Sequence, residues 1–304
     1  MRVLVTGSSG TIGTRLCEEL LRRGDEIAGI DWVKNKWLKE VDARTMRCDL
    51  RSTREISTLI IQGQFDAVVH LAANARVYEL VEHPDRAADN YLTLFHALEI
   101  ARAHGIPRFL FAGSREGYGN IATDNYTEDL VRVENCESPY TASKIGGEAL
   151  VWAYGRCYGL RHIITRFSNV YGMYDDSVRV VPQFIRQARA NQPLTIFGEK
   201  KCLDFTYIDD AVAGILLCLD RFDDVKNDTF NIATGTASTI LRLAESIKEL
   251  TGSKSVIDLR ESRTGEVISY TANIAKAKEK LGYDPKVGFE EGVKKAVEWY
   301  KANT

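Results

Sequence analysis

Short apolar runs alternate with longer amphipathic stretches along the first half of the chain. The run Val3–Val5 is followed by a glycine-rich turn, after which Ile12, Leu16 and Leu20 recur at helical spacing. Further strands are predicted at 26–31, 67–71, 108–112 and 162–167, and helices near 86–104 and 141–158. Strands that alternate with helices are typical of a parallel sheet covered by helices on both faces. The pattern therefore predicts an α/β fold.

The turn after the first strand carries the chemistry of a dinucleotide site. It reads Gly7-Ser8-Ser9-Gly10-Thr11-Ile12-Gly13, and its glycines let the backbone turn tightly and approach a pyrophosphate at the start of a helix. The second predicted strand ends in Asp31, at the distance expected for a carboxylate that binds a ribose 2′-hydroxyl. Asp31 would repel a 2′-phosphate, which favours NAD over NADP. Lys34 and Lys36 lie close enough to reach such a phosphate, although solvated loop charges are the simpler interpretation.

The second half of the chain has a mixed pattern. Helices are predicted near 179–191, 209–220, 239–251 and 274–281, and strands near 194–197, 205–208 and 229–232. We predict a Rossmann-type doubly wound parallel sheet with a smaller, discontinuous C-terminal substrate-binding lobe. The NAD-binding domain is expected to span 1–170 with returning segments at about 205–234. The lobe is expected to comprise 171–204 and 235–304, with the ligand cleft between the two.

Composition agrees with an enzyme outside the membrane. The chain has 304 residues, 44% of them hydrophobic, and a net charge of -2, so nothing in its charge indicates nucleic acid or an acidic membrane surface. No apolar run reaches membrane-spanning length, and the first strand leaves no room for a signal peptide. Six scattered cysteines form no Cys-x-x-Cys pair, and the five histidines show no metal-ligand spacing. We expect a cytoplasmic protein with reduced thiols and no bound metal.

Tyr140 and Lys144 form the most informative pair in the sequence. Residues four apart share one face of a helix, so the Lys144 charge can favour the phenolate form of Tyr140. A tyrosine with a lowered pKa can take the proton of a substrate alcohol while hydride leaves the same carbon for a nicotinamide. A Tyr-x-x-x-Lys pair by itself is also common on solvated helices. In this chain the pair follows a glycine-rich turn typical of a dinucleotide site, which favours the catalytic interpretation.

Together the motifs of the chain are similar to one family over nearly the whole length. The chain resembles the extended short-chain dehydrogenase/reductase family of nucleotide-sugar epimerases and dehydratases, of the UDP-glucose 4-epimerase type. The matching segments are the glycine turn, Cys48-Asp49-Leu50, His70-Leu71-Ala72-Ala73, Asn90, Ser114 with Tyr118-Gly119, Pro139-Tyr140-x-x-x-Lys144, Arg166-Phe167-Ser168-Asn169-Val170-Tyr171-Gly172, Asp204–Asp210 and Arg263-x-Gly265-Glu266. They are specific for the family and much less specific for one reaction.

The resemblance implies a set of cofactor-binding residues. Asp49 and Leu50 would flank the adenine, Leu71, Ala72 and Ala73 would line the path to the nicotinamide ribose, and Lys144 would hold the ribose hydroxyls. The complete implied set is Gly7, Gly10, Thr11, Ile12, Gly13, Asp31, Asp49, Leu50, Leu71, Ala72, Ala73, Asn90, Tyr140, Lys144 and Phe167.

The resemblance also implies the catalytic and substrate-binding residues. Ser114 would bond the reacting oxygen beside Tyr140, while Asn169 and Arg263 would face the sugar and the diphosphate. Val181, Leu194 and Phe197 would lie near the base. His70 ends an apolar strand, so a hydrogen-bonded core histidine is expected there.

The family chemistry is an internal redox cycle. Tyr140 takes the proton of the sugar C4 hydroxyl as hydride passes to NAD, which leaves a 4-keto sugar. An epimerase then returns hydride to the other face, whereas a dehydratase first removes a C5 proton and the C6 hydroxyl. The family's dehydratases typically carry Thr-Asp-Glu, with the Asp as acid and the Glu as base. This chain reads Ser114-Arg115-Glu116, so Glu116 keeps the place of the base, but Arg115 cannot donate a proton at neutral pH.

Other departures concern the substrate pocket. Leu203 stands where many relatives have an arginine for the diphosphate, and Lys200 or Lys201 is a candidate substitute without the planar fork of arginine. Leu80 replaces a frequent serine near the sugar. Asn90-Tyr91-Leu92-Thr93-Leu94 departs from the common Asn-Val-x-Gly-Thr. We expect a sugar pocket that differs from that of typical glucose epimerases.

The primary hypothesis is an NAD-dependent nucleotide-sugar 4-epimerase that acts on a UDP-hexose through a transient 4-keto intermediate. The alternative of the same fold is a nucleotide-sugar 4,6-dehydratase or UDP-glucuronate decarboxylase that uses Glu116. A non-catalytic NAD-sensing or scaffold protein is the alternative from another class, and the intact Ser114, Tyr140 and Lys144 count against it. The helices near 86–104 and 141–158 resemble the pair through which family members form homodimers, so we expect a homodimer. The partner molecule is a nucleotide sugar, with no nucleic acid and no membrane.

Overall fold

The large sheet is the framework of the molecule. The computed structural model describes all residues from Met1 to Thr304. Seven parallel strands hydrogen-bond in the order β10-β6-β5-β4-β1-β2-β3. They are β1 (Arg2–Thr6), β2 (Glu26–Asp31), β3 (Thr45–Arg47), β4 (Ala67–His70), β5 (Arg108–Ser114), β6 (Arg161–Phe167) and β10 (Asp228–Ile232). The predicted Rossmann-type doubly wound sheet is confirmed, and its strand order reverses between β1 and β4.

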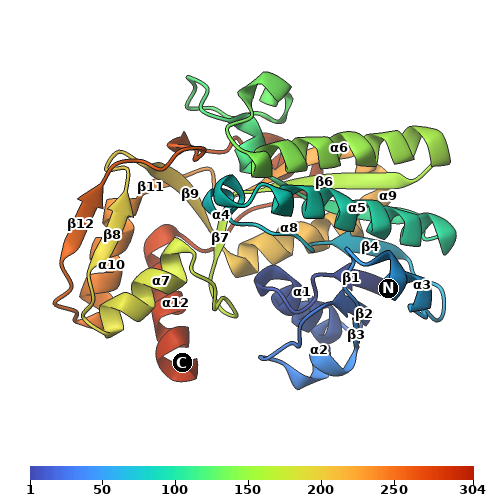
Figure 1. Ribbon diagram of the computed structural model, residues 1–304, viewed down its shortest axis with the longest axis horizontal. Coiled ribbons are helices and arrows are strands. Elements are labelled where there is room, and N and C mark those ends of the chain that lie inside the picture. Colours follow the sequence, from blue (N-terminus) through green and yellow to red (C-terminus); the bar gives the residue numbers. More distant parts are fainter.

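Both faces of the sheet are covered, because successive strand residues point to opposite sides. Val3 and Val5 pack into the core that contains Leu16, whereas Leu4 between them packs into the core that contains Leu98. The helices of the first face are α1 (Thr11–Arg22) and α8 (Ile208–Asp220), and those of the second face are α5 (Asp85–Ala103) and α6 (Pro139–Tyr158). Figure 1 shows α5 and α6 lying side by side along the sheet. Strands buried on both faces explain the nearly continuous apolar runs of the sequence.

Helix α6 places the pair Tyr140 and Lys144, and its ends are fixed by local chemistry. The Ser138 side chain accepts a hydrogen bond from the Thr141 backbone N–H, and Pro139 occupies the first turn. Gly159 ends the helix in the left-handed conformation, at φ 69°. The helix therefore begins immediately before Tyr140, at the carboxyl end of the sheet.

A buried ion pair ties α6 to the sheet one turn beyond Lys144. The Arg166 Nε and Nη2 atoms of β6 donate to the two Glu148 carboxylate oxygens at 2.9 and 2.7 Å. Only 5% of Arg166 is exposed. Its Nη1 atom donates to the Tyr118 hydroxyl at 3.1 Å, and that hydroxyl donates to the Asn231 side chain of β10 at 2.6 Å. The network connects α6 with two strands of the large sheet.

A second group of elements forms the smaller lobe, which lies at the left of Figure 1. Strand β9 (Cys202–Tyr207) pairs with β7 (Asn169–Tyr171), β11 (Ala237–Thr239) and β13 (Ser269–Tyr270), and β8 (Leu194–Phe197) pairs with β12 (Ile257–Arg260). The helices of this lobe are α7 (Val180–Arg189), α10 (Ile240–Thr251) and α12 (Phe289–Asn303), whereas α11 (Ala275–Leu281) packs against β10 of the large sheet and against α8. The remaining short helices are α2 (Lys39–Ala43), α3 (Thr53–Thr58), α4 (Val77–Glu82) and α9 (Phe222–Val225).

Several features of this half differ from the predicted elements, and the short strands β7, β11, β12 and β13 were not predicted. The predicted strand near 205–208 begins three residues earlier, as β9, and pairs only with lobe strands. Helix α12 was absent from the prediction, although Val293, Ala296, Val297 and Tyr300 lie at helical spacing and are buried. The chain returns to the large sheet through α8 and β10. The boundaries of the two predicted domains stay a proposal. None of the helices combines the length and apolarity that a transmembrane span requires.

Candidate functional site

One cavity lies between the carboxyl end of the large sheet and the lobe. Its volume is about 790 Å³, and its walls come from the turn after β1, the end of β5, α4, α6, α7 and β8. It brings together most of the site residues predicted from the sequence. These are Gly7, Gly10, Thr11, Ile12, Gly13, Leu71, Ala73, Ser114, Glu116, Tyr140, Lys144, Phe167, Asn169, Val181, Phe197 and Arg263.

A smaller group of predicted residues does not line this cavity. These residues are Ala72, Leu194, Asp31, Asp49, Leu50 and Asn90. Asp31 and Asp49 lie at the carboxyl ends of β2 and β3, next to the glycine turn along the same edge of the sheet. The predicted adenosine contacts therefore form a separate region beside the cavity.

Two glycines of the turn, Gly7 and Gly13, have no space for a side chain. Gly7 has a φ of +75°, and a Cβ atom there would lie 2.7 Å from the Ala72 nitrogen. A Cβ atom on Gly13 would lie 2.0 Å from the Gly7 carbonyl oxygen. Helix α1 begins after Gly10 without a side-chain cap, so its first backbone N–H groups are available to an anion. These features fit the pyrophosphate of a dinucleotide.

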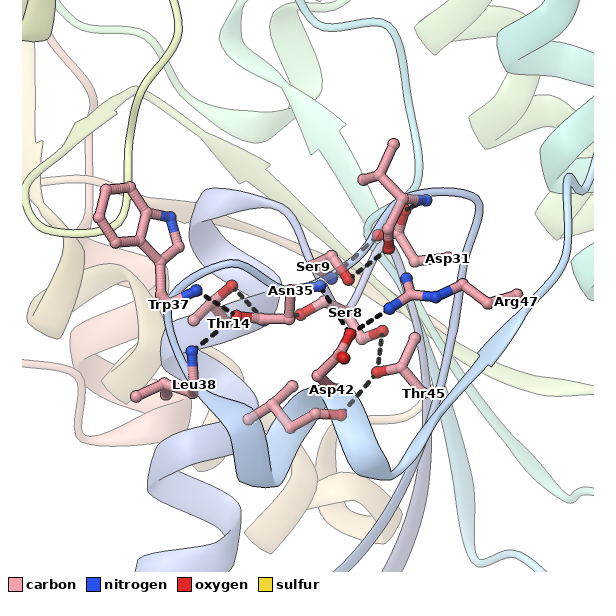
Figure 2. Close-up of polar contacts among 12 residues, drawn as sticks. Ser8, Ser9, Thr14, Asp31, Asn35, Trp37, Leu38, Asp42, Thr45 and Arg47 are labelled. Atoms are coloured by element: carbon pink, nitrogen blue, oxygen red, sulfur yellow. Dashed lines mark hydrogen bonds and ion pairs between the residues drawn. The ribbon is translucent and has the colours of Figure 1, made fainter.

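The Asp31 carboxylate lies directly beside this turn (Figure 2). Its two oxygens accept hydrogen bonds from the backbone N–H groups of Ser9 at 2.9 Å and Val33 at 3.1 Å. Burial raises the pKa of Asp31, and the backbone N–H donors oppose that effect. The carboxylate is thus held in place by the backbone and keeps acceptor capacity for ribose hydroxyls.

Asn35 organises the loop after β2, as Figure 2 shows. Its side-chain oxygen accepts from the backbone N–H groups of Trp37 and Leu38, at 3.1 and 2.9 Å. Its side-chain nitrogen donates to the Ser8 carbonyl oxygen and the Thr14 hydroxyl, at 3.3 and 2.9 Å. Asn35 therefore couples this loop to the glycine turn, a role that the sequence analysis missed because an asparagine in a loop carries no specific signal.

Two of the cations around Asp31 are paired with carboxylates. Lys36 forms an ion pair with Asp176, and Arg47 forms one with Asp42. Lys34 is exposed. A 2′-phosphate would therefore meet the Asp31 carboxylate and paired cations rather than an open basic pocket, which agrees with NAD.

Asp49 and Leu50 are held by neighbours in this structure. Arg51 binds the Asp49 carboxylate through its Nε and Nη2 atoms, with distances of 2.9 Å to Oδ1 and 2.7 Å to Oδ2. The Arg51 guanidinium lies over the exposed Trp32 ring, 4.7 Å from its centroid. Leu50 is buried, and its carbonyl oxygen bonds the His96 ring. The proposed contact of this pair with adenine stays a prediction.

Asn90 acts on the loop after β4. Its side-chain oxygen accepts from the Asn74 backbone N–H at 2.6 Å, and its nitrogen donates to the Asn74 carbonyl oxygen at 3.0 Å and to the Ser143 hydroxyl at 3.2 Å. Asn90 is buried. Any effect of Asn90 on a cofactor would therefore pass through the loop that carries Leu71 and Ala73.

A segment after β7 reaches from the lobe to the edge of the glycine turn. The Thr11 hydroxyl donates to the Tyr174 carbonyl oxygen at 3.4 Å, and the Tyr174 hydroxyl donates to Glu18 at 3.0 Å. The Trp37 ring contacts the rings of Tyr174 and Trp299, with centroid distances of 6.1 and 5.0 Å. Asp175, in the same segment, lines the cavity. We call this segment, residues 172–179, the strap.

Tyr140 is buried at the centre of the cavity wall. Its ring packs in a small cluster with Leu80 of α4 and Ala87 of α5, and 6% of the residue is exposed. Burial and the Glu116 charge raise the pKa of Tyr140, whereas the Ser114 hydrogen bond and the charges of Arg179 and Arg115 lower it, and the pKa lies above its ordinary value. The prediction that Lys144 lowers this pKa is therefore wrong for this structure, because burial of the phenol outweighs the groups that favour the phenolate.

Lys144 lies one turn further along α6 and is equally buried. Its ammonium donates to the Ala112 carbonyl oxygen of β5 at 2.8 Å and lies 6.0 Å from the Tyr140 ring centroid. Burial lowers the pKa of Lys144 to about 8, and the charge of Glu148 opposes that effect. The lysine is therefore positioned by the end of β5, two residues before Ser114.

Arg115 and Glu116 form a buried ion pair at the end of β5. The Arg115 Nη2 atom lies 2.7 Å from Glu116 Oε1 and donates to Asn169 Oδ1 at 3.3 Å. Arg115 and Glu116 are 6% and 5% exposed, and both line the cavity. Burial raises the pKa of Glu116, and the Arg115 charge lowers it. Arg115 Nη1, Glu116 Oε2 and Asn169 Nδ2 are buried without a hydrogen-bond partner.

The opposite end of the cavity carries a stacked arginine. The Arg263 guanidinium lies between the rings of Phe197 and Tyr78, at 3.7 and 4.6 Å from their centroids. Lys201 is buried, lines the cavity and pairs with Glu266 at 2.5 Å. Of the two lysines considered as substitutes for an arginine at Leu203, only Lys201 reaches the cavity.

Several cavity residues were not predicted from the sequence. Arg76 and Tyr78 lie at the start of α4, Arg86 lies in the first turn of α5, and Arg179 precedes α7. Arg76 and Arg86 both pair with Glu79. Nothing in the local pattern distinguishes these arginines from solvated charges, because only the tertiary fold turns them toward the cavity.

His70 is a core residue, as expected. Its Nδ1 atom and the Thr6 hydroxyl are 2.7 Å apart, and burial lowers the pKa of His70 to about 3. It does not line the cavity. The structure contains no group of three or more His, Cys, Asp or Glu side chains that could hold a metal ion.

Comparison with known proteins identifies the family. The sequence model of the NAD dependent epimerase/dehydratase family matches residues 3–233. The chain belongs to this family. A UDP-glucuronate 4-epimerase of Thermodesulfobacterium geofontis is 30% identical over 99% of this chain and 96% of its own length. A dTDP-glucose 4,6-dehydratase of Haemophilus influenzae is 28% identical over 100% of this chain and 99% of its own length.

A solved structure agrees with this assignment. The UDP-glucose 4-epimerase of Thermotoga maritima, determined with UDP-glucose, superposes with a TM-score of 0.90 at 30% identity, over 99% of each chain. As a member of the epimerase/dehydratase family, the chain is an NAD-dependent enzyme of the extended short-chain dehydrogenase/reductase type. Gly7 and Gly13, which have no space for a side chain, and the uncapped start of α1 fit the cofactor that the family requires.

Proposed function

We propose that this enzyme is a nucleotide-sugar 4-epimerase that acts on a UDP-hexose through a transient 4-keto sugar. One observation carries the proposal. Ser114, Tyr140 and Lys144 line the same cavity as the glycine turn, while Arg115 stands where a dehydratase needs a proton donor. Similarity to epimerases of UDP-glucose and UDP-glucuronate supports the choice of nucleotide and reaction.

The protein would hold its cofactor through the glycine turn, Asp31 and Lys144. The turn offers backbone N–H groups to the pyrophosphate, and the Asp31 carboxylate offers acceptors to the adenosine ribose. Lys144 would exchange its bond with the Ala112 carbonyl oxygen for the hydroxyls of the nicotinamide ribose. When bound, NAD supplies the acceptor and later the donor of the hydride.

Tyr140 would act as the base at the sugar C4 hydroxyl. Its phenolate form takes that proton as the C4 carbon is oxidised, and the same phenol returns a proton when the ketone is reduced on its other face. The Ser114 hydroxyl would hold the reacting oxygen in both directions. The charges of Arg115 and Arg179 favour the phenolate, whereas burial and the Glu116 charge oppose it and keep the pKa of Tyr140 above its ordinary value.

Arg115 argues against elimination of a C6 hydroxyl. A dehydratase needs an acid at this place to protonate the leaving group, and a guanidinium cannot supply that proton at neutral pH. In this chain the Arg115 guanidinium is engaged by Glu116 and Asn169. The 4-keto sugar would therefore keep its C6 hydroxyl until the ketone is reduced, which favours epimerisation.

A dehydratase or a UDP-glucuronate decarboxylase is the second candidate. Glu116 favours it, because this carboxylate lines the cavity with one oxygen unpartnered and burial raises its pKa. A carboxylate with a raised pKa at the cavity wall is suited to remove a proton beside a ketone. A non-catalytic role as sensor or scaffold has no comparable support.

The reaction can be identified from its products in deuterated water. Purified protein is incubated with NAD and either UDP-glucose or UDP-glucuronate, and the products are followed by proton NMR and mass spectrometry. We expect an isomer of unchanged mass, inverted at C4 and without deuterium at C5. Loss of water with deuterium at C5, or loss of carbon dioxide, would identify the second candidate. A Tyr140→Phe protein with full turnover would contradict the mechanism.

We further propose that the enzyme is a homodimer in the cytoplasm. Helices α5 and α6 expose Tyr91, Leu92, Phe95 and Trp152, and an adjacent apolar pair of helices is suited to a symmetric interface. The six cysteines are free, which suits a reducing compartment. Light scattering at micromolar concentration tests the assembly, and a mass of one chain would contradict it.

A further inference from the structure

The strongest unexplained feature of the cavity is a set of three unpartnered polar atoms on adjoining residues. Buried side-chain polar atoms nearly always have a hydrogen-bond partner. Here Arg115 Nη1, Glu116 Oε2 and Asn169 Nδ2 have none, although Arg115 bonds both other residues. All three residues line the cavity, so the partner of these atoms is a group that enters it.

The chemistry of the three atoms restricts that group. Arg115 Nη1 and Asn169 Nδ2 can only donate, and an ionised Glu116 Oε2 can only accept. An occupant that satisfies all three must therefore both accept and donate. A hydroxyl does so, whereas a carboxylate has no proton to donate and would leave Glu116 Oε2 without a partner.

The charges around these three atoms also favour an uncharged occupant over a carboxylate. Glu116 already neutralises the Arg115 guanidinium at 2.7 Å, in a region where Lys201 is likewise neutralised by Glu266. A second carboxylate beside Arg115 would lose its hydration and face the Glu116 carboxylate. An uncharged hydroxyl avoids this cost.

Arg115, Glu116 and Asn169 lie close to Ser114 and Tyr140, the residues that would act at the reacting carbon. Glu116 is two residues after Ser114, whose hydroxyl accepts a hydrogen bond from the Glu116 backbone N–H at 3.2 Å. The charges of Glu116 and Arg115 both act on Tyr140. A sugar whose C4 hydroxyl reaches Tyr140 and Ser114 therefore presents a neighbouring substituent to this set.

We propose that Arg115, Glu116 and Asn169 form a specificity subsite that admits a hydroxyl-bearing substituent next to the reacting carbon and excludes a carboxylate, with Glu116 as the excluding residue. The inference rests on the proposed function and deepens it, since it selects a neutral hexose over a uronate.

Binding measurements without turnover test the proposal. The Tyr140→Phe protein, loaded with NAD, is titrated with UDP-glucose and with UDP-glucuronate by calorimetry. We expect UDP-glucose to bind more tightly by about 30-fold or more, the factor that one unsatisfied buried polar atom produces. Equal binding, or tighter binding of UDP-glucuronate, would overturn the proposal, and this measurement keeps the Arg115–Glu116 pair intact.

A second substitution tests the excluding residue. Glu116→Gln in the same background keeps the shape of the side chain and turns an acceptor into a donor. The preference for UDP-glucose is expected to fall by about 30-fold or more, because a carboxylate then meets three donors. Glu82→Gln removes the same charge from an exposed position at the same cavity and is expected to leave the preference unchanged. An equal loss of both ligands in Glu116→Gln would also overturn the proposal.

The proposed function fails on a different measurement. Turnover of UDP-glucose by the protein with Tyr140 in place tests epimerisation. If UDP-glucose binds with the expected preference but is dehydrated, the proposed function is wrong and the subsite stands. If UDP-glucuronate is epimerised with a higher kcat/KM than UDP-glucose, the function stands in its general form and the subsite is wrong.

Discussion

The Lys144 ammonium donates a 2.8 Å hydrogen bond to the Ala112 carbonyl oxygen. This contact joins α6 to the end of β5, so the two elements that carry Tyr140 and Ser114 are aligned by a charged side chain. The charge is buried, and burial lowers the pKa of Lys144 from 10.5 to about 8. The same lysine that orients the site therefore lowers the stability of the protein without ligands.

The first prediction concerns the pH dependence of this cost. Below pH 8 Lys144 is protonated in the folded and the unfolded chain, so the burial cost is fully present. Between pH 8 and 10.5 the unfolded chain binds the proton that the folded chain has lost, and folding stability rises with pH. At pH 7, the free energy of unfolding of the Lys144→Met protein is expected to exceed that of the original protein by up to about 3 kcal/mol. Urea denaturation should show this advantage shrink toward pH 10.5.

The exposed Lys226 provides the control for this series. Its substitution by Met should change the free energy of unfolding little and with no trend between pH 7 and 10. A difference between Lys144→Met and the original protein that stays constant over this range would contradict the prediction.

The second prediction concerns two glycines of the turn. A Cβ atom at Gly13 would lie 2.0 Å from the Gly7 carbonyl oxygen, whereas one at Gly10 has only that same oxygen nearby, at 3.3 Å. Gly13→Ala should therefore lower the free energy of unfolding by about 2 kcal/mol or more, and Gly10→Ala by less than about 1 kcal/mol. Both should bind NAD more weakly, because either methyl group meets the pyrophosphate. Equal stability of the two variants in urea would show that the turn relaxes.

The third prediction concerns the choice between NAD and NADP. The Asp31 carboxylate is fixed by the Ser9 and Val33 backbone N–H groups, and its charge repels a 2′-phosphate. Asp31→Ser removes this charge and keeps a hydroxyl for the ribose. The ratio of the Kd for NADP to the Kd for NAD is expected to fall by about tenfold or more, in line with the energy of one close charge pair in a partly solvated site. Calorimetry measures both constants, and an unchanged ratio would contradict the role of Asp31.

The fourth prediction concerns the buried pair of Arg166 and Glu148. Glu148→Gln leaves the Arg166 guanidinium buried without its counter-ion, which should cost about 3–5 kcal/mol of unfolding free energy. The exposed pair of Lys295 and Glu291 on α12 gives the matched control, and Glu291→Gln should cost less than about 1 kcal/mol. Thermal and urea denaturation check both variants. A similar loss of unfolding free energy in Glu148→Gln and Glu291→Gln would contradict the prediction and indicate that water solvates the Arg166 guanidinium.

The sequence predicted the arrangement of the reacting groups because parallel strands end at one edge of a sheet. The glycine turn follows β1, Ser114 ends β5 and Tyr140 begins α6, so a correct strand order brings them together without knowledge of any contact. Helix α1 was equally accessible, since Leu16 and Leu20 face the sheet at the expected spacing.

The remaining features depend on side chains that meet across long sequence separations. Lys201 and not Lys200 faces the cavity, because β9 begins at residue 202 and the turn before it fixes the orientation of each lysine. The bond of Arg115 to Asn169 joins residues 54 apart. Asn90 satisfies its side chain on Asn74, which a motif cannot reveal. Such contacts follow from the packing of the lobe on the sheet.

The strap carries a consequence for cofactor exchange. Its Tyr174 bonds Thr11 and Glu18, and its Asp176 pairs with Lys36, so residues on either side of the glycine turn are tied to the lobe. These bonds hold the strap beside the turn that would carry the pyrophosphate of the dinucleotide. A cofactor that is reduced and reoxidised within each reaction cycle has no need to leave. For an enzyme with the proposed function, we therefore expect the strap to slow the release of the dinucleotide, which would stay bound from one turnover to the next.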